Sequence, residues 1–217
     1  MKRPKRAVAI LAAGALLLGQ ALSTRAAEAP EPVIVALGDS LTAGLGLPQD
    51  EAFPVVLERR LRAAGHGAKV IDAGVSGDTA GAGLARLDWA IPADASAVII
   101  ELGANDALQG LPPEATKASL EAIIKRVEAR GLPILLVGME APRNMGKDYV
   151  EAFSAIYRDL AKRYDVVFYP FFLDGVVLDE SLTQDDGLHP NGKGVARIVD
   201  RITPKVEELL ARVKPKS

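Results

Sequence analysis

Four short polar segments of this sequence contain residue types that could carry out nucleophilic chemistry. In chain order they are LGDSLTAG (37–44), GVSGDT (74–79), GAND (103–106) and DDGLHPN (185–191). The first segment contains Ser40 and directly follows the apolar run VIVA. A hydroxyl in a glycine-containing turn after a strand has two interpretations: either the loop binds a ligand through its backbone, or the serine is a nucleophile.

The segment DDGLHPN contains one of only two histidines in the chain and supplies what a serine nucleophile needs. A neutral imidazole must accept the hydroxyl proton, and a carboxylate must orient that imidazole. The spacing Asp186-x-x-His189 puts both groups on one tight turn, in which Gly187 and Pro190 can fold Asp186 back towards Nδ1 of His189. Because Nε2 of His189 is then free to face Ser40, these residues predict a catalytic group of Ser40, Asp186 and His189.

The tetrahedral intermediate of acyl transfer also needs hydrogen-bond donors for its oxyanion. The backbone N–H groups of Ser40 and Gly77 and the side-chain amide of Asn105 are the candidates, and Gly77 suits the role because a peptide without a side chain can approach the substrate closely. Taken singly, Ser40 is typical of a turn or helix N-cap, and Asn105 of a loop amide that satisfies backbone groups. Only their combination favours catalysis.

The remaining polar residues of these segments are interpreted as structural. We expect Asp39 to cap or brace its loop, and we expect surface or loop-bracing roles for three further carboxylates, Asp78, Asp106 and Asp185. The second histidine, His66, lies between two glycines and is expected to be a solvated turn residue.

Short apolar runs alternate with stretches of helical period from residue 33 onwards. We predict strands at 33–37, 69–75, 97–102, 133–139 and 166–169, and helices at 53–64, 80–90, 113–130, 148–163 and 194–213. Strands that are apolar throughout and separated by helices belong to a parallel sheet covered on both faces. The sequence therefore predicts a three-layer α/β/α sandwich with about five parallel strands, in which ligands bind outside the carboxyl ends of the strands.

The first 26 residues have the pattern of a secretory signal peptide. A basic start, MKRPKR, precedes an apolar run over 7–21, and Thr24-Arg-Ala26 offers small residues where a signal peptidase reads the chain. The apolar run is shorter than a comfortable membrane span. We expect cleavage after Ala26 or Ala27, leaving a single domain over 27–217 that is periplasmic or secreted and has no stable membrane span. An uncleaved membrane anchor is the alternative.

The composition narrows the classes of partner. The chain has 217 residues, of which 49% are hydrophobic and 25% charged, as is usual for one globular domain. Its formal net charge is −2, and because the segment 1–26 holds five basic and no acidic residues, the rest carries −7. Nucleic-acid binding is not expected without a basic footprint. The sequence contains no cysteine, which excludes disulfides and thiolate zinc sites.

In order and approximate spacing, the four segments resemble the signature blocks of the GDSL or SGNH hydrolases. That family is named for a serine, a glycine, an asparagine and a histidine, which here are Ser40, Gly77, Asn105 and His189. The resemblance runs from residue 33 to the final predicted helix and is strongest for the bacterial periplasmic group of thioesterase I, arylesterase and lysophospholipase. It implies a flavodoxin-like fold, a Ser40–His189–Asp186 triad, an oxyanion hole from Ser40, Gly77 and Asn105, and no metal or organic cofactor.

The resemblance also implies that the loop 140–147 selects the substrate. The substrate-binding residues expected there are Met139, Pro142 and Met145.

Motifs and resemblance together predict a serine hydrolase that cleaves carboxylic esters and thioesters through an acyl-enzyme. The expected substrates are small or lipid-like acyl esters: aryl esters, short- to medium-chain esters, acyl thioesters or lysophospholipids. One alternative is a carbohydrate acetylesterase on the same fold. The other is a noncatalytic flavodoxin-like module that binds phosphate or flavin, but it leaves the pairing of Asp186 with His189 unexplained.

Overall fold

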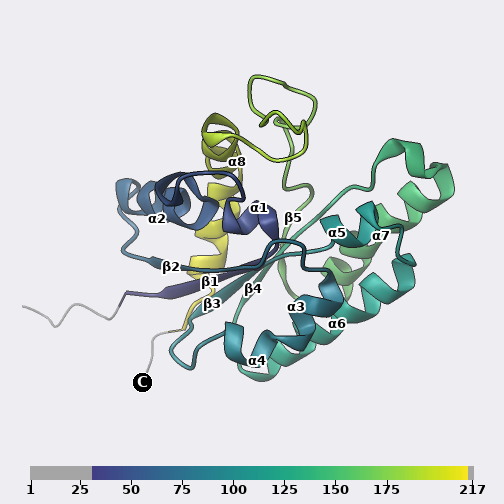
Figure 1. The fold of residues 1–217 in the computed structure, drawn as a ribbon. Helices are drawn as coiled ribbons and strands as arrows, with labels where there is room; N and C mark the ends of the chain where they lie inside the picture. Colours follow the sequence, from purple (N-terminus) through teal and green to yellow (C-terminus); the bar gives the residue numbers. More distant parts are fainter. Residues whose placement is uncertain (1–30, 215–217) are drawn as a thin grey trace, which may run out of the picture.

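The computed structural model describes residues 31–214, so the segment that we interpret as a signal peptide lies outside the described residues. Five parallel strands form one sheet in the order β2-β1-β3-β4-β5 (Figure 1). The strands are β1 Val33–Gly38, β2 Lys69–Gly74, β3 Ala97–Glu101, β4 Ile134–Val137 and β5 Val167–Tyr169. This is the flavodoxin-like order, so the predicted parallel sheet is confirmed.

Helices cover both faces of the sheet, which confirms the predicted three layers. On one face lie α2 (Phe53–Ala63) and α8 (Gly192–Ala211), and on the other lie α3 (Ala80–Ala85), α4 (Leu87–Ala90), α6 (Pro113–Ala129) and α7 (Lys147–Arg163) (Figure 1). Within residues 31–214, no helix has the length and apolar character needed to cross a membrane.

The hydrophobic pattern explains why these segments fold as they do. All five residues of β3 are buried, as expected for a central strand covered on both faces. In α6 the buried apolar residues are Leu120, Ile123, Ile124 and Val127, which recur at the period of one helix face. The core therefore lies between the sheet and the inner face of each helical layer.

The helical segment predicted over 80–90 forms two helices that meet at Arg86. The backbone of Arg86 leaves the helical region, and its side chain turns inward to the end of β1. Two short helices, α1 (Ser40–Ala43) and α5 (Ala104–Leu108), were not predicted, nor were the 3-10 turns η1 (Gln49–Glu51) and η2 (Arg143–Met145). The predicted ends of the other elements differ from the observed ones by a few residues at most, the scale on which helix ends are ambiguous.

Candidate active site

The polar segments after β1, β2 and β3 meet at the carboxyl edge of the sheet. Asp39 caps α1 by accepting a hydrogen bond from the Leu41 backbone N–H at 2.9 Å, so Ser40 becomes the first residue of that helix. The turn is tight enough that a Cβ on Gly38 would overlap Thr42 Oγ1, which explains the glycine at that position. The strand end and its cap together fix where the Ser40 hydroxyl points.

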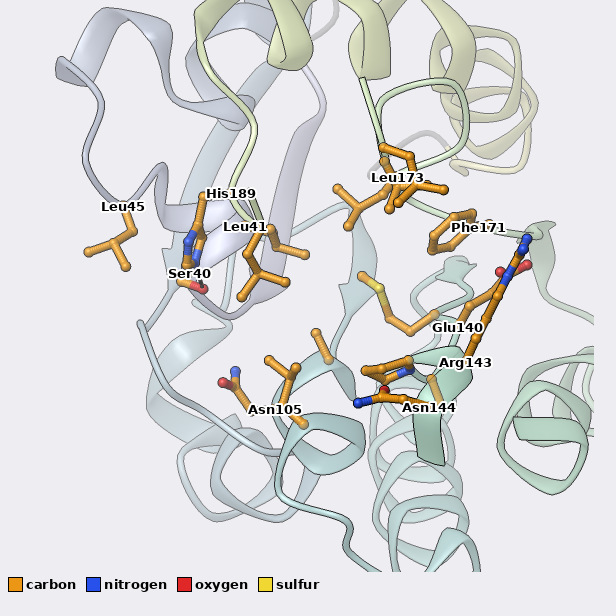
Figure 2. Close-up of a pocket in the computed structure, with 18 of the residues that line it drawn as sticks. Ser40, Leu41, Leu45, Asn105, Glu140, Arg143, Asn144, Phe171, Leu173 and His189 are labelled. Atoms are coloured by element: carbon orange, nitrogen blue, oxygen red, sulfur yellow. Dashed lines mark hydrogen bonds between the residues drawn. The ribbon is translucent and has the colours of Figure 1, made fainter. Parts of the chain in front are cut away.

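Ser40 and His189 are 149 positions apart in the chain, yet their side chains are in contact. Ser40 Oγ lies 2.9 Å from His189 Nε2, and His189 Nδ1 lies 2.5 Å from Asp186 Oδ2. Ser40 is 8% exposed. Figure 2 shows Ser40 and His189 together at one end of a pocket. The order hydroxyl, imidazole, carboxylate is the one that transfers a proton from a serine nucleophile.

The turn that carries His189 is held by the carboxylate of Asp186. Asp186 Oδ1 accepts the backbone N–H groups of Leu188 and His189, each at 2.9 Å, while Oδ2 faces the imidazole. Gly187 has φ +66°, a left-handed conformation that glycine adopts without strain. The hydrogen bond with the His189 side chain, with help from the two backbone bonds, lowers the pKa of Asp186 to about 2. Asp186 is therefore a carboxylate at neutral pH.

The three oxyanion candidates follow three different strand ends and line the same pocket. As the first residue of α1, Ser40 has a backbone N–H without a partner inside the helix. Gly77 has φ +88°, and both it and Asn105 line the pocket. The Asn105 amide Nδ2 donates to Asp78 O at 2.9 Å and to Asp39 Oδ2 at 3.2 Å. An oxyanion bound there must therefore share an N–H group that already has an acceptor.

Two buried carboxyl groups lie beneath the Ser40 turn. Burial raises the pKa of Asp39 to about 6, although the Leu41 backbone N–H opposes that rise. Burial also raises the pKa of Glu101 well above its ordinary value, and the nearby Asp39 charge acts in the same direction. Thr42 Oγ1 donates to Glu101 Oε2 at 2.6 Å. Both groups are fully buried, but both Asp39 oxygens accept hydrogen bonds, whereas Glu101 Oε1 has no partner among the described residues, so we assign the negative charge of the pair to Asp39.

Arg86 links the loop after β2 to the loop after β1. Its Nε lies 2.5 Å from Asp78 Oδ2, and its terminal NH2 donates to Gly38 O at 2.9 Å. Because Asp78 O is also an acceptor for Asn105, this buried guanidinium helps to hold two of the segments that meet at Ser40. Sequence reasoning took Asp78 for a loop-bracing carboxylate, but it did not identify Arg86 as its partner.

A pocket of about 630 Å³ opens beside Ser40 and His189. Its walls are mainly apolar, and Leu41, Met139, Pro142, Phe171 and Leu173 are among the residues that line it. In Figure 2, Glu140, Arg143 and Asn144 lie at the end away from Ser40. A cavity of this size with few polar groups is suited to a small apolar ligand or an acyl chain.

The expected substrate-binding residues are only partly found at this pocket. Met139 and Pro142 line it, as do the loop residues Arg143 and Asn144, whereas Met145 is not among the lining residues and its Cε lies near Gly110. The other apolar walls were not identified from the sequence, because single leucines and phenylalanines in loops follow no period. Their one recognisable signal is position, since Leu41, Leu45 and Leu188 stand within five residues of Ser40 or His189.

The remaining predicted residues take structural positions. Asp106 is buried rather than on the surface, and it braces the loops by accepting the Ala80 backbone N–H at 2.8 Å and the Thr116 hydroxyl at 2.9 Å. Asp185 is exposed. His66 is half-buried, with Nε2 3.4 Å from a carboxylate oxygen of Glu207, and it lies apart from the pocket.

Several known proteins are similar to this chain in sequence. Residues 36–197 match the model of the GDSL-like lipase/acylhydrolase family. The chain is 36% identical over 203 residues to esterase TesA of Pseudomonas aeruginosa, which covers 93% of this chain and 99% of that protein. It is 39% identical over 190 residues to thioesterase 1/protease 1/lysophospholipase L1 of Escherichia coli, covering 87% of this chain and 89% of that protein.

A solved structure is similar over most of the described residues. The crystal structure of AlinE4, an SGNH-hydrolase family esterase, superimposes with a TM-score of 0.71 at 42% identity. The superposition covers 84% of this chain and 98% of that one.

Proposed function

The chain belongs to the GDSL-like lipase/acylhydrolase family and is a serine hydrolase of carboxylic esters and thioesters, and from this premise we propose that Ser40, His189 and Asp186 carry the reaction. The observation that carries the proposal is the continuous series of contacts from Ser40 Oγ to His189 Nε2, at 2.9 Å, and from His189 Nδ1 to Asp186 Oδ2, at 2.5 Å. The first distance lies within the range needed for proton transfer, and the second contact lets Asp186 orient the imidazole.

In the first half of the reaction, Ser40 Oγ attacks the acyl carbon while His189 Nε2 accepts the hydroxyl proton. The imidazolium is stabilised by the Asp186 carboxylate, which stays ionised throughout. His189 then returns the proton to the leaving alcohol or thiol, and an acyl-enzyme remains on Ser40. In the second half, His189 activates a water molecule that hydrolyses this ester by the reverse route.

We assign the oxyanion of each tetrahedral intermediate to the backbone N–H groups of Ser40 and Gly77 and to the Asn105 side-chain amide. Support comes from their positions after three different strand ends, where all three residues line the same pocket, and from the left-handed backbone of Gly77. Such donors act on the charge that develops in the transition state, so they affect kcat more than substrate binding.

We propose that the substrates are acyl esters whose chains enter the apolar pocket, including aryl esters and lysophospholipids. The pocket volume of about 630 Å³ and its apolar walls favour an acyl chain longer than acetyl. One relative is named a lysophospholipase, which agrees with such a chain. Because one acyl-enzyme forms from either oxoesters or thioesters, the same site serves both.

The direct test of the catalytic proposal is Ser40→Ala assayed with p-nitrophenyl butyrate. We expect turnover to fall by about 10⁴-fold or more, because the nucleophile is removed. The thermal midpoint should change little. Ser119→Ala is a matched control, since Ser119 is half-buried on α6, does not line the pocket, and donates its hydroxyl to the Ala115 carbonyl of the same helix. Turnover by Ser40→Ala close to that of the control would remove Ser40 from the mechanism.

A carbohydrate acetylesterase is the alternative for the same residues, and the chain-length dependence of kcat/KM distinguishes the two. We expect kcat/KM to rise from acetyl to octanoyl esters, because each added methylene is buried against the apolar walls. Release of acetate from acetylated sugars, with no turnover of octanoyl esters, would favour the alternative.

We also propose that the protein is exported and that the segment 1–26 is removed. The support is the order of basic, apolar and small residues in that segment. Full-length protein expressed in a Gram-negative host should appear in the periplasmic fraction with an amino terminus at residue 27 or 28. Recovery of the uncleaved chain from the membrane fraction would favour the anchor instead.

A further inference from the structure

Exposed apolar side chains gather at the mouth of the pocket. Among the described residues, seven large apolar side chains are classed as exposed, and five of the seven line this pocket. These five, which we call the apolar rim, are Leu45, Leu108, Val177, Leu178 and Leu188. Single exposed apolar residues are normal on a protein surface, but a cluster around a ligand site marks a surface for interaction.

The apolar rim is assembled from four separate parts of the chain. Leu45 follows α1, Leu108 ends α5, Val177 and Leu178 lie between β5 and α8, and Leu188 lies on the turn that carries His189. The connection between β5 and α8 projects beyond the body of the molecule (Figure 1). The rim therefore lies on several sides of the entrance, and its exposure does not depend on the position of a single loop.

Leu178 is the clearest member of the rim. It is 85% exposed, and with φ +69° it is the one residue other than glycine in the left-handed region within residues 31–214. A glycine or asparagine would adopt this conformation at lower cost. A side chain that only lined the pocket would be covered by the protein on one side. The Leu178 side chain is instead almost entirely exposed. Folding stability does not explain a leucine at this position.

Few ionisable side chains line the pocket, and the exposed charged residues next to the rim in the chain are acidic, namely Asp179 and Glu180 after Leu178 and Asp185 and Asp186 before Leu188. Of the residues that line the pocket, the ionisable ones are Glu140, Arg143 and His189, and none belongs to the apolar rim. The chain after residue 26 carries −7, so attraction to an anionic surface is not expected. Burial of apolar side chains is therefore the interaction that would favour binding of a partner at the apolar rim.

We propose that the apolar rim docks on the surface of an aggregated zwitterionic lipid, a micelle or bilayer, so that an acyl ester passes from the lipid into the pocket. The proposal rests on the proposed function, because it assumes that an acyl chain occupies the pocket beside Ser40. A second copy of this chain seated on the rim would cover the entrance, whereas a lipid surface covers the rim and supplies the substrate at the same time.

The single tryptophan of the chain allows a matched fluorescence experiment. Trp89 is 72% exposed on α4, at the opposite end of the molecule from the connection between β5 and α8 (Figure 1). We compare Ser40→Ala, which keeps Trp89, with Ser40→Ala/Trp89→Phe/Leu178→Trp, whose only tryptophan is on the rim. Phenylalanine at position 89 preserves an aromatic face for Arg86, and Ser40→Ala prevents hydrolysis of the lipid.

Both proteins are titrated with phosphatidylcholine vesicles, with dodecylphosphocholine micelles and, at low and high salt, with phosphatidylglycerol vesicles. We expect the emission of the tryptophan at position 178 to shift to shorter wavelength and to become shielded from iodide, while Trp89 emission stays unchanged. In cosedimentation, Ser40→Ala/Val177→Ser/Leu178→Ser should partition at least tenfold less onto vesicles than Ser40→Ala/Trp89→Ser.

Four results would overturn the docking proposal. They are no binding by any variant, an equal shift at both tryptophan positions, binding confined to phosphatidylglycerol and abolished by salt, and a dimer that the rim substitutions dissociate. Hydrolysis of water-soluble p-nitrophenyl butyrate by the protein with Ser40 intact tests the proposed function separately. If the protein does not bind lipid but still hydrolyses this ester through Ser40, only the rim proposal is rejected.

Discussion

The carboxylate of Asp186 has two separate roles at the scale of single residues. One oxygen holds the backbone of the turn through Leu188 and His189, and the other faces the imidazole. Stabilising the imidazolium needs the ionised form, and the lowered pKa of about 2 provides it. A carboxylate with a lowered pKa stabilises the fold at every pH above its ordinary value near 4, and that contribution is lost as the pH falls towards 2.

Asp186→Asn should separate these two roles. The amide oxygen can still accept the two backbone N–H groups, but an amide N–H facing Nδ1 favours the wrong imidazole tautomer. We therefore expect kcat at pH 7.5 to fall by about a hundredfold or more, while the thermal midpoint at that pH changes by a few degrees only. Steady-state kinetics and calorimetry on one preparation check both statements. A kcat within threefold of the wild-type value would show that Asp186 has no orienting role.

Asn105 offers a second test at this scale, because both of its amide N–H groups already have acceptors. If the oxyanion takes a share of one of them, Asn105→Ala should lower kcat and kcat/KM together by about a hundredfold, with KM nearly unchanged. A rise in KM at constant kcat would instead assign Asn105 to ground-state binding. Asn105→Asp is a useful companion, since it keeps the shape, loses the donor and adds charge beside Asp39.

At the scale of elements, the four-residue helix α1 is held from below by groups that take no part in the reaction. Thr42 is fully buried, and its hydroxyl bonds to Glu101 at the end of β3. Glu101 Oε1 has no hydrogen-bond partner among the described residues. Since burial raises the pKa of Glu101 well above its ordinary value, the neutral acid is the form that fits this position.

Glu101→Gln should therefore make stability less dependent on pH. A carboxyl group whose pKa is raised by folding contributes stability at low pH, and that contribution is lost as the pH rises through its value in the folded protein. We expect the wild-type thermal midpoint to fall between pH 5 and pH 9 by more than that of Glu101→Gln. Parallel slopes for the two proteins would mean that Glu101 is not the group responsible. Ser119→Ala, a half-buried serine of α6 that lies outside the pocket, controls for general effects of substitution.

The same elements show which parts of the fold can be predicted from the sequence. The strands and long helices were predicted because a buried face repeats over many residues, as in α6. The helices α1 and α5, with four and five residues, are too short to show such a period. The break at Arg86 depends on a contact with Gly38 O, 48 positions away, which no local pattern reveals.

At the scale of the whole molecule, the residues of the proposed catalytic site were easier to identify from the sequence than the walls of the pocket. Ser40, Gly77, Asn105 and His189 lie in short motifs whose residue types match one reaction, and the parallel sheet brings the motifs to one edge. The apolar walls come from separate loops, where an isolated Leu45 or Phe171 has no pattern around it. Their grouping depends on the complete tertiary structure, and so does the proposal that the rim meets lipid.

The central claim is that Ser40 is the nucleophile activated by His189, and covalent trapping tests it most directly. The protein is incubated with a p-nitrophenyl phosphonate ester, and the adduct is mapped by mass spectrometry of the intact chain and its peptides. We expect one phosphonyl group per molecule on Ser40, formed at least a hundredfold more slowly in His189→Ala. An adduct on any other residue, or equal labelling of Ser40→Ala, would contradict the account.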